Sequence, residues 1–339
     1  MGLCNCLPEK KEEPVSNTED LRLVYKPPAE ATPTDFLQNT YQTESQIMML
    51  QGALRGYVTR STTETVPSSI LNSIRYDLLS AKGESVRKFQ TPFVYPLSNK
   101  SCRWQDLTEV KELGHYIGQV NSKGEFHGIG CLYSEDGGLT EGSWTKGEAN
   151  GLVRKTFNNG DVLEGQFCGN NIHGKGTLQV FEGEKYEGQF ENGLLNGFGR
   201  ETSPDGTYFE GNFLNGVKHG RGKFVWKDGS WYEGDFSFGN IEGQGEYVWN
   251  NGRYYNGDWV ANKMHGKGLF RWQDGRYYEG EYHMDKKNGY GVFVWSNGKK
   301  FEGFWRDGQQ HGTGKLTNSA GKVRQGMWDY GKFKEKLKP

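Results

Sequence analysis

The sequence is poor in cysteine and proline, with 5 and 10 residues in 339. The cysteines show no disulfide framework and no zinc-ligand spacing beyond one Cys-x-Cys, which excludes a disulfide-stapled secreted domain. No apolar run approaches the roughly 18 residues that a membrane span needs. No apolar signal-peptide core follows the first residue. We therefore expect a chain that is made and kept in the cytosol.

An excess of either charge is also missing, because 41 Lys and Arg balance 42 Asp and Glu to a net charge of -1. The two signs are interspersed, which excludes bulk attraction to nucleic acid. Glycine, by contrast, is abundant and uneven. Residues 1–114 hold five of the 50 glycines and the remainder hold 45. This step in composition predicts a domain boundary near Gly114.

The glycines after this boundary follow a period of 23 residues, and such a period is the signature of a repeat architecture. One series follows a pair formed by an aromatic and an acidic residue, and a second series keeps the same step. The first series is Gly142, Gly165, Gly188, Gly211, Gly234, Gly257, Gly280, Gly303 and Gly326. The second is Gly128, Gly151, Gly174, Gly197, Gly220, Gly243, Gly266, Gly289 and Gly312.

Within each repeat, side chains alternate with period two, as in a β-strand. Tyr278, Gly280 and Tyr282 fall on one face, so we predict two strands of about five or six residues per repeat. One join carries an Asp-Gly or Asn-Gly pair, typical of a tight hairpin turn in which both central residues have positive φ. The other join, 260–265 in one copy, is expected to be longer and more variable.

The face that carries the glycines also carries aromatic side chains, two positions after every glycine of the first series and two positions before six of them. We expect each glycine to leave space over which a neighbouring ring packs. A column of tryptophans recurs in the most regular copies. It consists of Trp226, Trp249, Trp272 and Trp295.

These residues resemble the MORN repeat, over 116–331, as nine repeats and a trailing half. The resemblance implies an elongated single antiparallel β-sheet of repeated hairpins, with a concave aromatic groove that binds partners. We therefore predict a mainly β fold over 115–331, followed by a basic tail over 332–339. The predicted groove residues are Trp226, Trp249, Trp272, Trp295, Tyr232, Tyr255, Tyr278 and Trp259.

The N-terminal residues favour lipid attachment. Gly2 is the position whose α-amine can be myristoylated, although Cys6 stands where the usual pattern has Ser or Thr. One myristoyl chain binds membranes only marginally, so stable attachment needs a second acyl chain on Cys4 or Cys6. We predict acylation at all three positions, within a disordered spacer over 1–42. The alternative is a disordered start without lipid.

A helical pattern with an apolar stripe begins at residue 43. It resembles the IQ motif, whose five positions are filled by Leu50, Gln51, Arg55, Gly56 and Arg60. The resemblance implies binding of calmodulin or a calmodulin-like EF-hand protein. The alternative is a short amphipathic helix packed on the repeats. Two more helices are predicted, over 68–81 and 101–113, so that 43–114 is a helical segment whose end caps the first repeat.

Two polar columns resemble catalytic or metal sites, and geometry argues against both. One repeat advances two strands, about 9.6 Å, so histidines 46 residues apart lie about 19 Å from one another. Zinc needs its ligands within about 2.1 Å of a shared ion. A glutamate column has the same problem and is interpreted as a solvated face. We predict no enzyme activity, no metal and no cofactor. The histidines are His127, His173, His219, His265 and His311.

Together these patterns predict a non-enzymatic scaffold on the cytoplasmic face of a plasma or ciliary membrane, associated with the cytoskeleton. Its partners would be a calmodulin-like protein and a helical or peptide segment of a cytoskeletal, ciliary or membrane-junction protein. A second hypothesis is that the sheet itself binds anionic phospholipid headgroups. A third is an accessory subunit of an enzyme. A homodimer also remains open.

Overall fold

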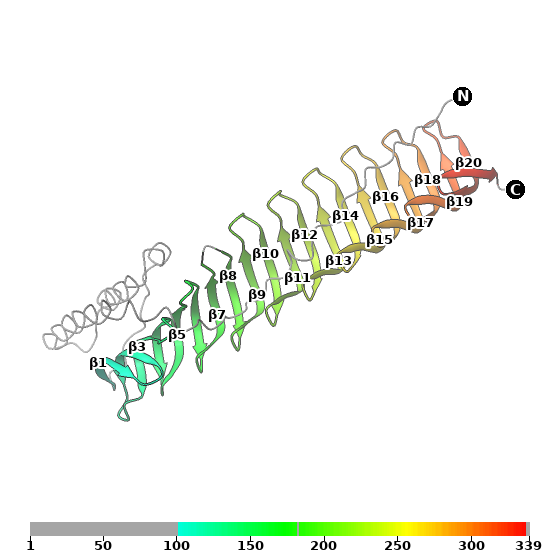
Figure 1. The fold of residues 1–339 in the computed structure, drawn as a ribbon. Helices are drawn as coiled ribbons and strands as arrows, with labels where there is room; N and C mark the ends of the chain where they lie inside the picture. The colour runs from blue at the N-terminus through cyan, green and yellow to red at the C-terminus, as the bar shows by residue number, and fades with distance from the viewer. Residues whose placement is uncertain (1–100, 182, 337–339) are drawn as a thin grey trace. The chain divides into compact units, whose positions relative to one another are not determined.

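The computed structural model describes residues 101–181 and 183–336, and every regular element within them is a strand (Figure 1). These residues form one open antiparallel sheet of 21 strands, in which neighbours in sequence are neighbours in the sheet. The predicted fold, a single sheet of repeated hairpins, is confirmed. The described residues fall into two compact units that divide between Gly197 and Phe198.

The strands of the first repeats are β1 Arg103–Val110, β2 Gly114–Val120, β3 Phe126–Tyr133, β4 Leu139–Thr145, β5 Glu148–Thr156, β6 Val162–Cys168, β7 Asn171–Gln179, β8 Lys185–Glu191 and β9 Leu194–Thr202. The later strands are β10 Tyr208–Leu214, β11 Val217–Val225, β12 Trp231–Ser237, β13 Asn240–Val248, β14 Tyr254–Val260, β15 Lys263–Arg271, β16 Tyr277–His283, β17 Lys286–Val294, β18 Lys300–Arg306, β19 Gln309–Thr317, β20 Val323–Asp329 and β21 Lys332–Lys336.

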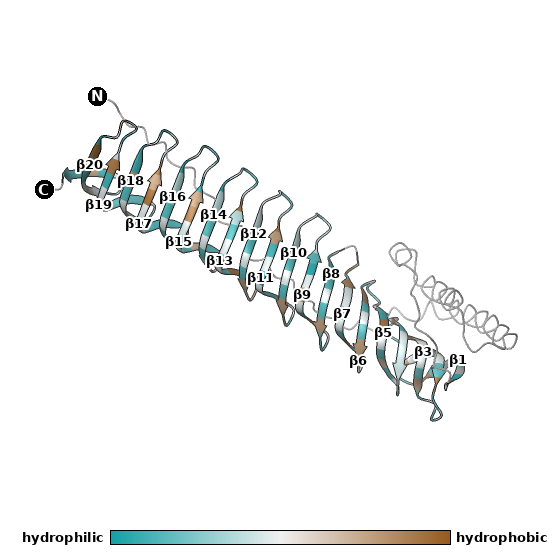
Figure 2. Ribbon diagram, turned by 180° about the vertical axis from the view of Figure 1, so that it is seen from behind, coloured by the Kyte–Doolittle hydropathy of each residue, from teal (hydrophilic) through white to brown (hydrophobic). Residues whose placement is uncertain are grey.

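The period-two alternation divides each strand between the core and the opposite face. Along β14, Tyr255, Gly257 and Trp259 are buried, whereas Asn256 and Val260 are exposed. Figure 2 shows the resulting mixture of hydrophilic and hydrophobic residues along the strands. Because the sheet has no second layer of helices or strands among the described residues, its core is made by rings that lie on its own surface.

Each repeat has two connections between strands, and the structure reverses their predicted lengths: the connection predicted to be tight is the longer one. In the Asn251-Gly252 join, only the glycine has positive φ, and the Gly252 N–H donates to the Trp249 carbonyl in a three-residue loop. The tight two-residue turn lies at the other join, where Ala261 and Asn262 both have positive φ (48° and 65°). The prediction was wrong because glycine dipeptides occur at both joins, as Asn192-Gly193 and Asn215-Gly216 show at two-residue turns, so this sequence signal does not tell the two joins apart.

The helix predicted over 101–113 is also wrong for its central part, because Arg103–Val110 forms β1 and pairs antiparallel with β2. The register shifts between Gln105 and Thr108, as in a β-bulge. A bulge interrupts strict alternation, so that apolar positions fall at mixed spacings that resemble a helix. Pairing with the sheet then outweighs the weak local preference.

At the other end, the sheet continues past the boundary predicted at residue 331. Lys332–Lys336 forms β21 and pairs with β20. Phe333 packs against Trp328, with ring centres 5.0 Å apart. The pairing with β20 and this ring contact together hold the basic segment in the sheet. Within the described ranges, no helix is long and apolar enough to span a bilayer.

Candidate partner-binding surface

The predicted lipidation residues and the predicted calmodulin-binding residues lie outside the described part of the chain. The first set is Gly2, Cys4 and Cys6. The second set is Leu50, Gln51, Arg55, Gly56 and Arg60. Both remain predictions. The structure does place all eight residues that were predicted to line the groove, and it divides them into two groups.

Four of the eight form the core instead of lining an accessible groove. Tyr232, Tyr255 and Tyr278 are 0% exposed and Trp259 is 1% exposed. Each tyrosine lies over two glycines of its own hairpin. A Cβ added at Gly268 would collide with the Tyr255 ring. The rings thus fill the space that paired glycines leave, as the sequence predicted, but they are unavailable to a partner.

The tyrosine hydroxyls are held by the backbone beyond the ring. Tyr232 Oη donates to the Asp235 carbonyl at 3.1 Å, and Tyr255 Oη donates to the Asp258 carbonyl at 3.0 Å. Burial, with a smaller contribution from the nearby carboxylates, raises the pKa of both tyrosines well above the ordinary value. They therefore stay neutral and structural.

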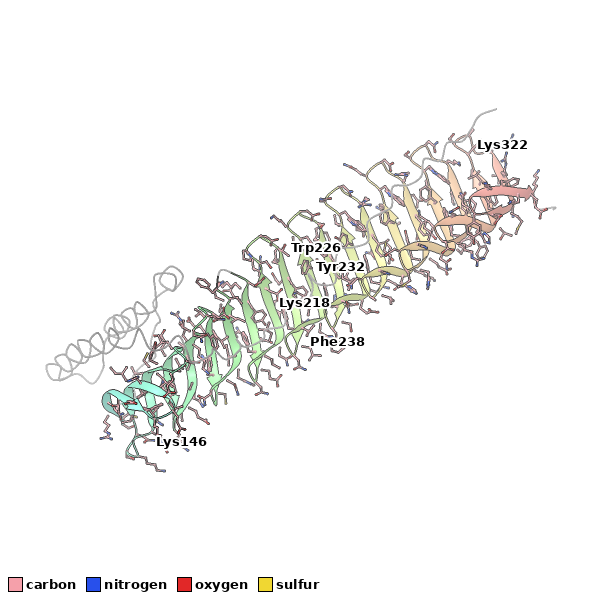
Figure 3. All side chains as sticks on the ribbon, viewed as in Figure 1. Lys146, Lys218, Trp226, Tyr232, Phe238 and Lys322 are labelled. Atoms are coloured by element: carbon pink, nitrogen blue, oxygen red, sulfur yellow. The ribbon has the colours of Figure 1, made fainter. Side chains whose placement is uncertain are left out.

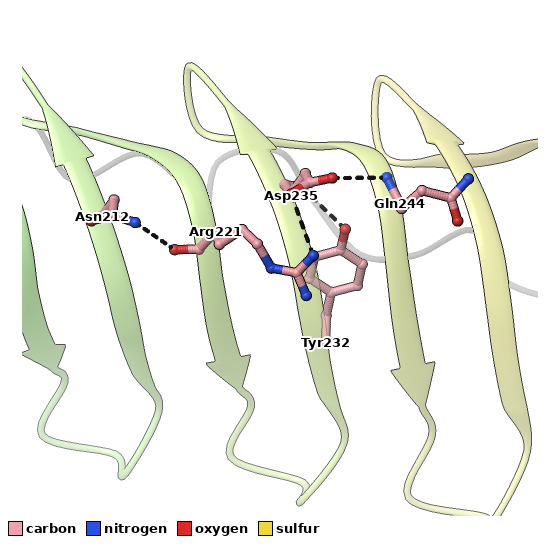
Figure 4. A network of polar contacts seen from close by, with 5 residues as sticks. All are labelled: Asn212, Arg221, Tyr232, Asp235 and Gln244. Carbon is pink, nitrogen blue, oxygen red and sulfur yellow. Dashed lines mark hydrogen bonds and ion pairs between the residues drawn. The ribbon is translucent and has the colours of Figure 1, made fainter.

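A β-bulge follows the glycine pairs, and in three later copies an acidic side chain completes it, as Asp235 does in Figure 4. The register of β12 and β13 shifts between Gly234 and Phe236. The Gln244 N–H, which this shift removes from the ladder, donates to Asp235 Oδ2 at 3.1 Å. The Lys267 N–H donates to Asp258 Oδ2 at 2.7 Å in the next repeat. These carboxylates have a structural role, because they satisfy backbone donors.

The tryptophan column remains half-buried at the three-residue loops. Its four indoles alternate with buried rings in a continuous series of contacts within 198–339, which we call the tryptophan ladder. Successive ring centres are 4.4 to 5.5 Å apart. The ladder consists of Trp226, Tyr247, Trp249, Phe270, Trp272, Phe293 and Trp295.

Cations stack on the later tryptophans of the ladder, and the sequence analysis missed them. The residue four positions after each tryptophan lies over its ring. The distances to the ring centres are 5.1 Å for Arg253 on Trp249, 5.3 Å for Arg276 on Trp272 and 4.5 Å for Lys299 on Trp295. The available signal was an Arg or Lys directly after the loop glycine. Its meaning depended on the three-residue loop, which folds that residue back onto the indole.

The loop itself orients two of these cations. Arg253 Nε donates to Asn251 Oδ1 at 3.1 Å, and Arg276 Nε lies 2.7 Å from Asp274 Oδ2. The Arg276 hydrogen bond lowers the pKa of Asp274, so this carboxylate stays ionised at neutral pH. A guanidinium fixed in this way keeps its remaining N–H donors for another acceptor.

The histidine column packs at the opposite ends of the strands, by the two-residue turns. His219 Nδ1 accepts the Phe238 N–H at 3.5 Å, and Glu242 Oε2 accepts the Ala261 N–H in the equivalent place one repeat later. The interpretation as turn packing is confirmed for His219. Figure 3 labels Trp226 and Phe238, with Tyr232 between them. Within the described residues, no cluster of His, Cys, Asp or Glu could hold a metal ion.

The glutamate column was interpreted as a solvated face, and on that face three of its members pair with cations on a neighbouring strand and two with a lysine of their own strand. Glu233 lies 3.1 Å from Lys223, and Glu210 lies 3.4 Å from Arg200. Glu141 differs, because it is 0% exposed, so the interpretation is wrong for that residue. None of these contacts brings two carboxylates together, so this column lacks the pair that acid–base catalysis uses.

An open antiparallel sheet built from 23-residue hairpins defines a repeat protein. The family model of the MORN repeat matches nine segments of it, which together cover more than half of the chain, so the protein belongs to the MORN-repeat family. The matched segments are 116–139, 141–162, 164–179, 186–208, 209–231, 232–252, 255–275, 278–300 and 301–323. A search of the curated proteins finds no match.

Several solved structures are similar over part of the chain. The TCP domain of SAS-4 (dCPAP) of Drosophila melanogaster, in complex with a proline-rich motif of Ana2 (dSTIL), is 15% identical and has a TM-score of 0.24. The match covers 64% of this chain and 99% of that one. A catalytically inactive virginiamycin B lyase from Staphylococcus aureus with quinupristin is 11% identical, with 68% and 85% covered and a TM-score of 0.15.

Proposed function

We propose that the protein is a non-enzymatic scaffold that binds a protein partner through the ladder edge of its sheet. The observation that carries this proposal is the tryptophan ladder, in which four half-buried indoles recur once per repeat and alternate with buried rings. Half-buried tryptophans beside oriented arginines are typical of the residues that dominate protein interfaces. The partner class is a helical or extended segment of a cytoskeletal, ciliary or membrane-junction protein.

The N-terminal region would supply two further contacts. Acyl chains on Gly2, Cys4 and Cys6 would hold the chain on the cytoplasmic face of a membrane, because two chains are needed for stable attachment. A helix over 50–60 would bind calmodulin or a calmodulin-like protein. Pull-down of the full chain with calmodulin, with and without calcium, tests the second contact. Binding in neither state would remove it.

The second candidate function is direct binding of anionic phospholipid headgroups, and the cations of the ladder favour it. Flotation of the full chain with phosphatidylserine vesicles separates the two functions when the Gly2→Ala variant is included. The scaffold predicts that the acylated protein floats and that the Gly2→Ala variant stays at the bottom. A Gly2→Ala variant that floats equally well would support lipid binding by the sheet and contradict the lipid tether.

A further inference from the structure

The spacing of the tryptophan ladder limits the conformation of a segment that can follow it. Trp226 and Trp249 are joined by two ring steps of 5.1 and 4.4 Å through Tyr247. Successive tryptophans therefore lie no more than about 10 Å apart, in agreement with the advance of about 9.6 Å for two strands. A partner that contacts every rung must present equivalent side chains at this interval.

Three regular conformations can be compared with that interval. A polyproline II helix repeats every three residues and advances about 9.3 Å per turn. An α-helix returns to the same face after seven residues, about 10.5 Å. Over the three steps of the ladder the α-helix drifts by nearly 3 Å, whereas polyproline II drifts by about 1 Å. An extended strand places same-face residues about 6.6 Å apart, so it can meet only every second rung, after about 19.8 Å.

The charge of the ladder edge selects the side chain at each of these positions. Arg253, Arg276 and Lys299 recur once per repeat beside the indoles. Lys287 adds a fourth cation, with its Nζ 5.1 Å from the Trp272 ring. Asp274 pairs with Arg276, and Asp228 lies in the loop after Trp226, so these four cations are accompanied by two carboxylates along the ladder. The edge is therefore positive, and guanidinium groups held in this way suit carboxylates.

We propose that the tryptophan ladder binds a proline-containing segment of a partner protein in the polyproline II conformation, with a carboxylate at every third residue. The proline rings lie on the indoles, because flat aromatic grooves recognise this conformation. The carboxylates meet the cations of the same repeats. This inference rests on the proposed function and makes the partner class specific, since it excludes a helix along the ladder.

The test uses the full chain and three synthetic peptides, with affinities measured by calorimetry and by the tryptophan emission of the protein. (Pro-Pro-Glu)5 has the proposed conformation and spacing. (Gly-Ser-Glu)5 keeps the charge and the sequence spacing but is flexible. The third is an α-helical peptide with glutamate at every seventh position. We expect (Pro-Pro-Glu)5 to bind at least about tenfold more tightly than either control, since its bound conformation is formed in advance.

Two sets of variants locate the site. Arg253→Gln, Arg276→Gln and Lys299→Gln, combined, should weaken (Pro-Pro-Glu)5 binding by about tenfold or more. The matched control is Lys286→Gln, Arg306→Gln and Lys332→Gln, combined, beside the two-residue turns, which removes the same charge and should leave binding unchanged. Circular dichroism melting confirms that both sets fold. If the ladder set lowers the melting temperature, the three single variants replace it, and each should weaken binding by two- to fivefold.

Several outcomes would overturn the inference. Equal binding of (Pro-Pro-Glu)5 and (Gly-Ser-Glu)5 would show simple charge attraction. Tighter binding of the helical peptide, lost in the ladder variant, would overturn the conformation and leave the scaffold function standing. If no peptide binds and phosphatidylserine vesicles bind the Gly2→Ala protein through the same cations, both the inference and the scaffold function fail.

Discussion

At the scale of single residues, the ring over each glycine pair is the unit that builds this sheet. The irregular second repeat supports the same link between the ring and the glycine that faces it, because both are replaced there. Val153 replaces the glycine of β5 that faces Gly142, and Thr140 stands where other copies carry the ring. Both side chains are at most 9% exposed. The larger residue on one strand thus occupies the space that a missing ring leaves.

The first prediction tests this coupling at Gly257. An added Cβ would lie 2.6 Å from Tyr255 Oη and 2.5 Å from the Gly268 Cα. We expect Gly257→Val to lower the free energy of unfolding by about 3 kcal/mol, because the ring cannot move away within the core. Asn256→Val, on the exposed face, should change it by less than about 0.5 kcal/mol. Equal effects of the two variants in urea unfolding would contradict the packing account.

A buried ion pair allows a second prediction. Lys218 Nζ lies 2.6 Å from Glu201 Oε1, with side chains 1% and 8% exposed. The next repeat has Phe224 and Ile241 in these two positions. Lys218→Ile alone should cost about 3 kcal/mol, because it leaves a buried carboxylate unpaired. Adding Glu201→Phe should recover most of that loss. A double variant as unstable as the single one in denaturant unfolding would refute this.

The third prediction concerns pH. Asp285 Oδ1 accepts the Met264 N–H at 2.8 Å, and burial raises the pKa of Asp285 above its ordinary value of 3.8. Because the pKa is raised on folding, ionised Asp285 lowers the stability of the folded protein at a pH above its folded pKa. Below pH 3.8 the carboxyl is protonated in both states, and this loss of stability is absent. Asp285→Asn should therefore stabilise the protein at pH 7 by less than about 1 kcal/mol, since the group is half-exposed. Its advantage should disappear in acid.

The adjacent turn supplies the control for this pH dependence. Asn262 makes the equivalent contact, and its Oδ1 accepts the Ile241 N–H at 2.7 Å. Asn262→Asp should therefore destabilise the protein at pH 7 and regain stability as the pH falls. Thermal melting of both variants between pH 3 and pH 7 decides the matter. Curves of melting temperature against pH that run parallel for the wild type and both variants would show that neither residue contributes to the pH dependence of stability.

At the scale of the element, each hairpin combines two turns of different chemistry. The two-residue turn requires positive φ at both positions, and Ala261 adopts a φ of 48° there. Most residues other than glycine are strained at positive φ, and Asn is one of the few that tolerate it. At the other end of the strand, each three-residue loop needs one residue with positive φ, and glycine adopts this conformation without strain.

The fourth prediction follows from the strained turn. Ala261→Asn should stabilise the protein by about 0.5 kcal/mol, because Asn is favoured at the first position of this turn. Ala261→Val should destabilise it, since a branched side chain resists positive φ. The melting temperatures of the two variants should move in opposite directions. A stabilising effect of valine would mean that the turn does not keep this backbone conformation.

Much of the element structure could be predicted from the sequence. The alternation predicted that Tyr278, Gly280 and Tyr282 lie on one face of a strand, and they do so in β16, where Gly280 is opposite Gly291 in β17. The turn types could not be predicted, because Asn-Gly or Asp-Gly pairs stand at both joins, as Asn215-Gly216 and Asn251-Gly252 show. The strand at Arg103–Val110 was missed because its bulge hides the alternation.

At the scale of the whole molecule, the candidate site was only half predictable. Both the Tyr255 ring and the Trp249 ring recur with the repeat, and the period alone gives no measure of how deeply either is buried. The structure separates them, with Tyr255 closed over glycines and Trp249 at the margin of the core. The cation column depended on a contact between Trp249 and Arg253, which only the loop geometry creates.

The central claim is that this protein binds its partner through the tryptophan ladder. The most direct measurement is quantitative affinity purification from the native cell, with the full chain carrying either Arg253→Gln, Arg276→Gln and Lys299→Gln or the control changes at Lys286, Arg306 and Lys332. We predict a defined set of proteins that the ladder variant loses and the control variant retains. Recovery of the same proteins with wild type and both variants would contradict the claim.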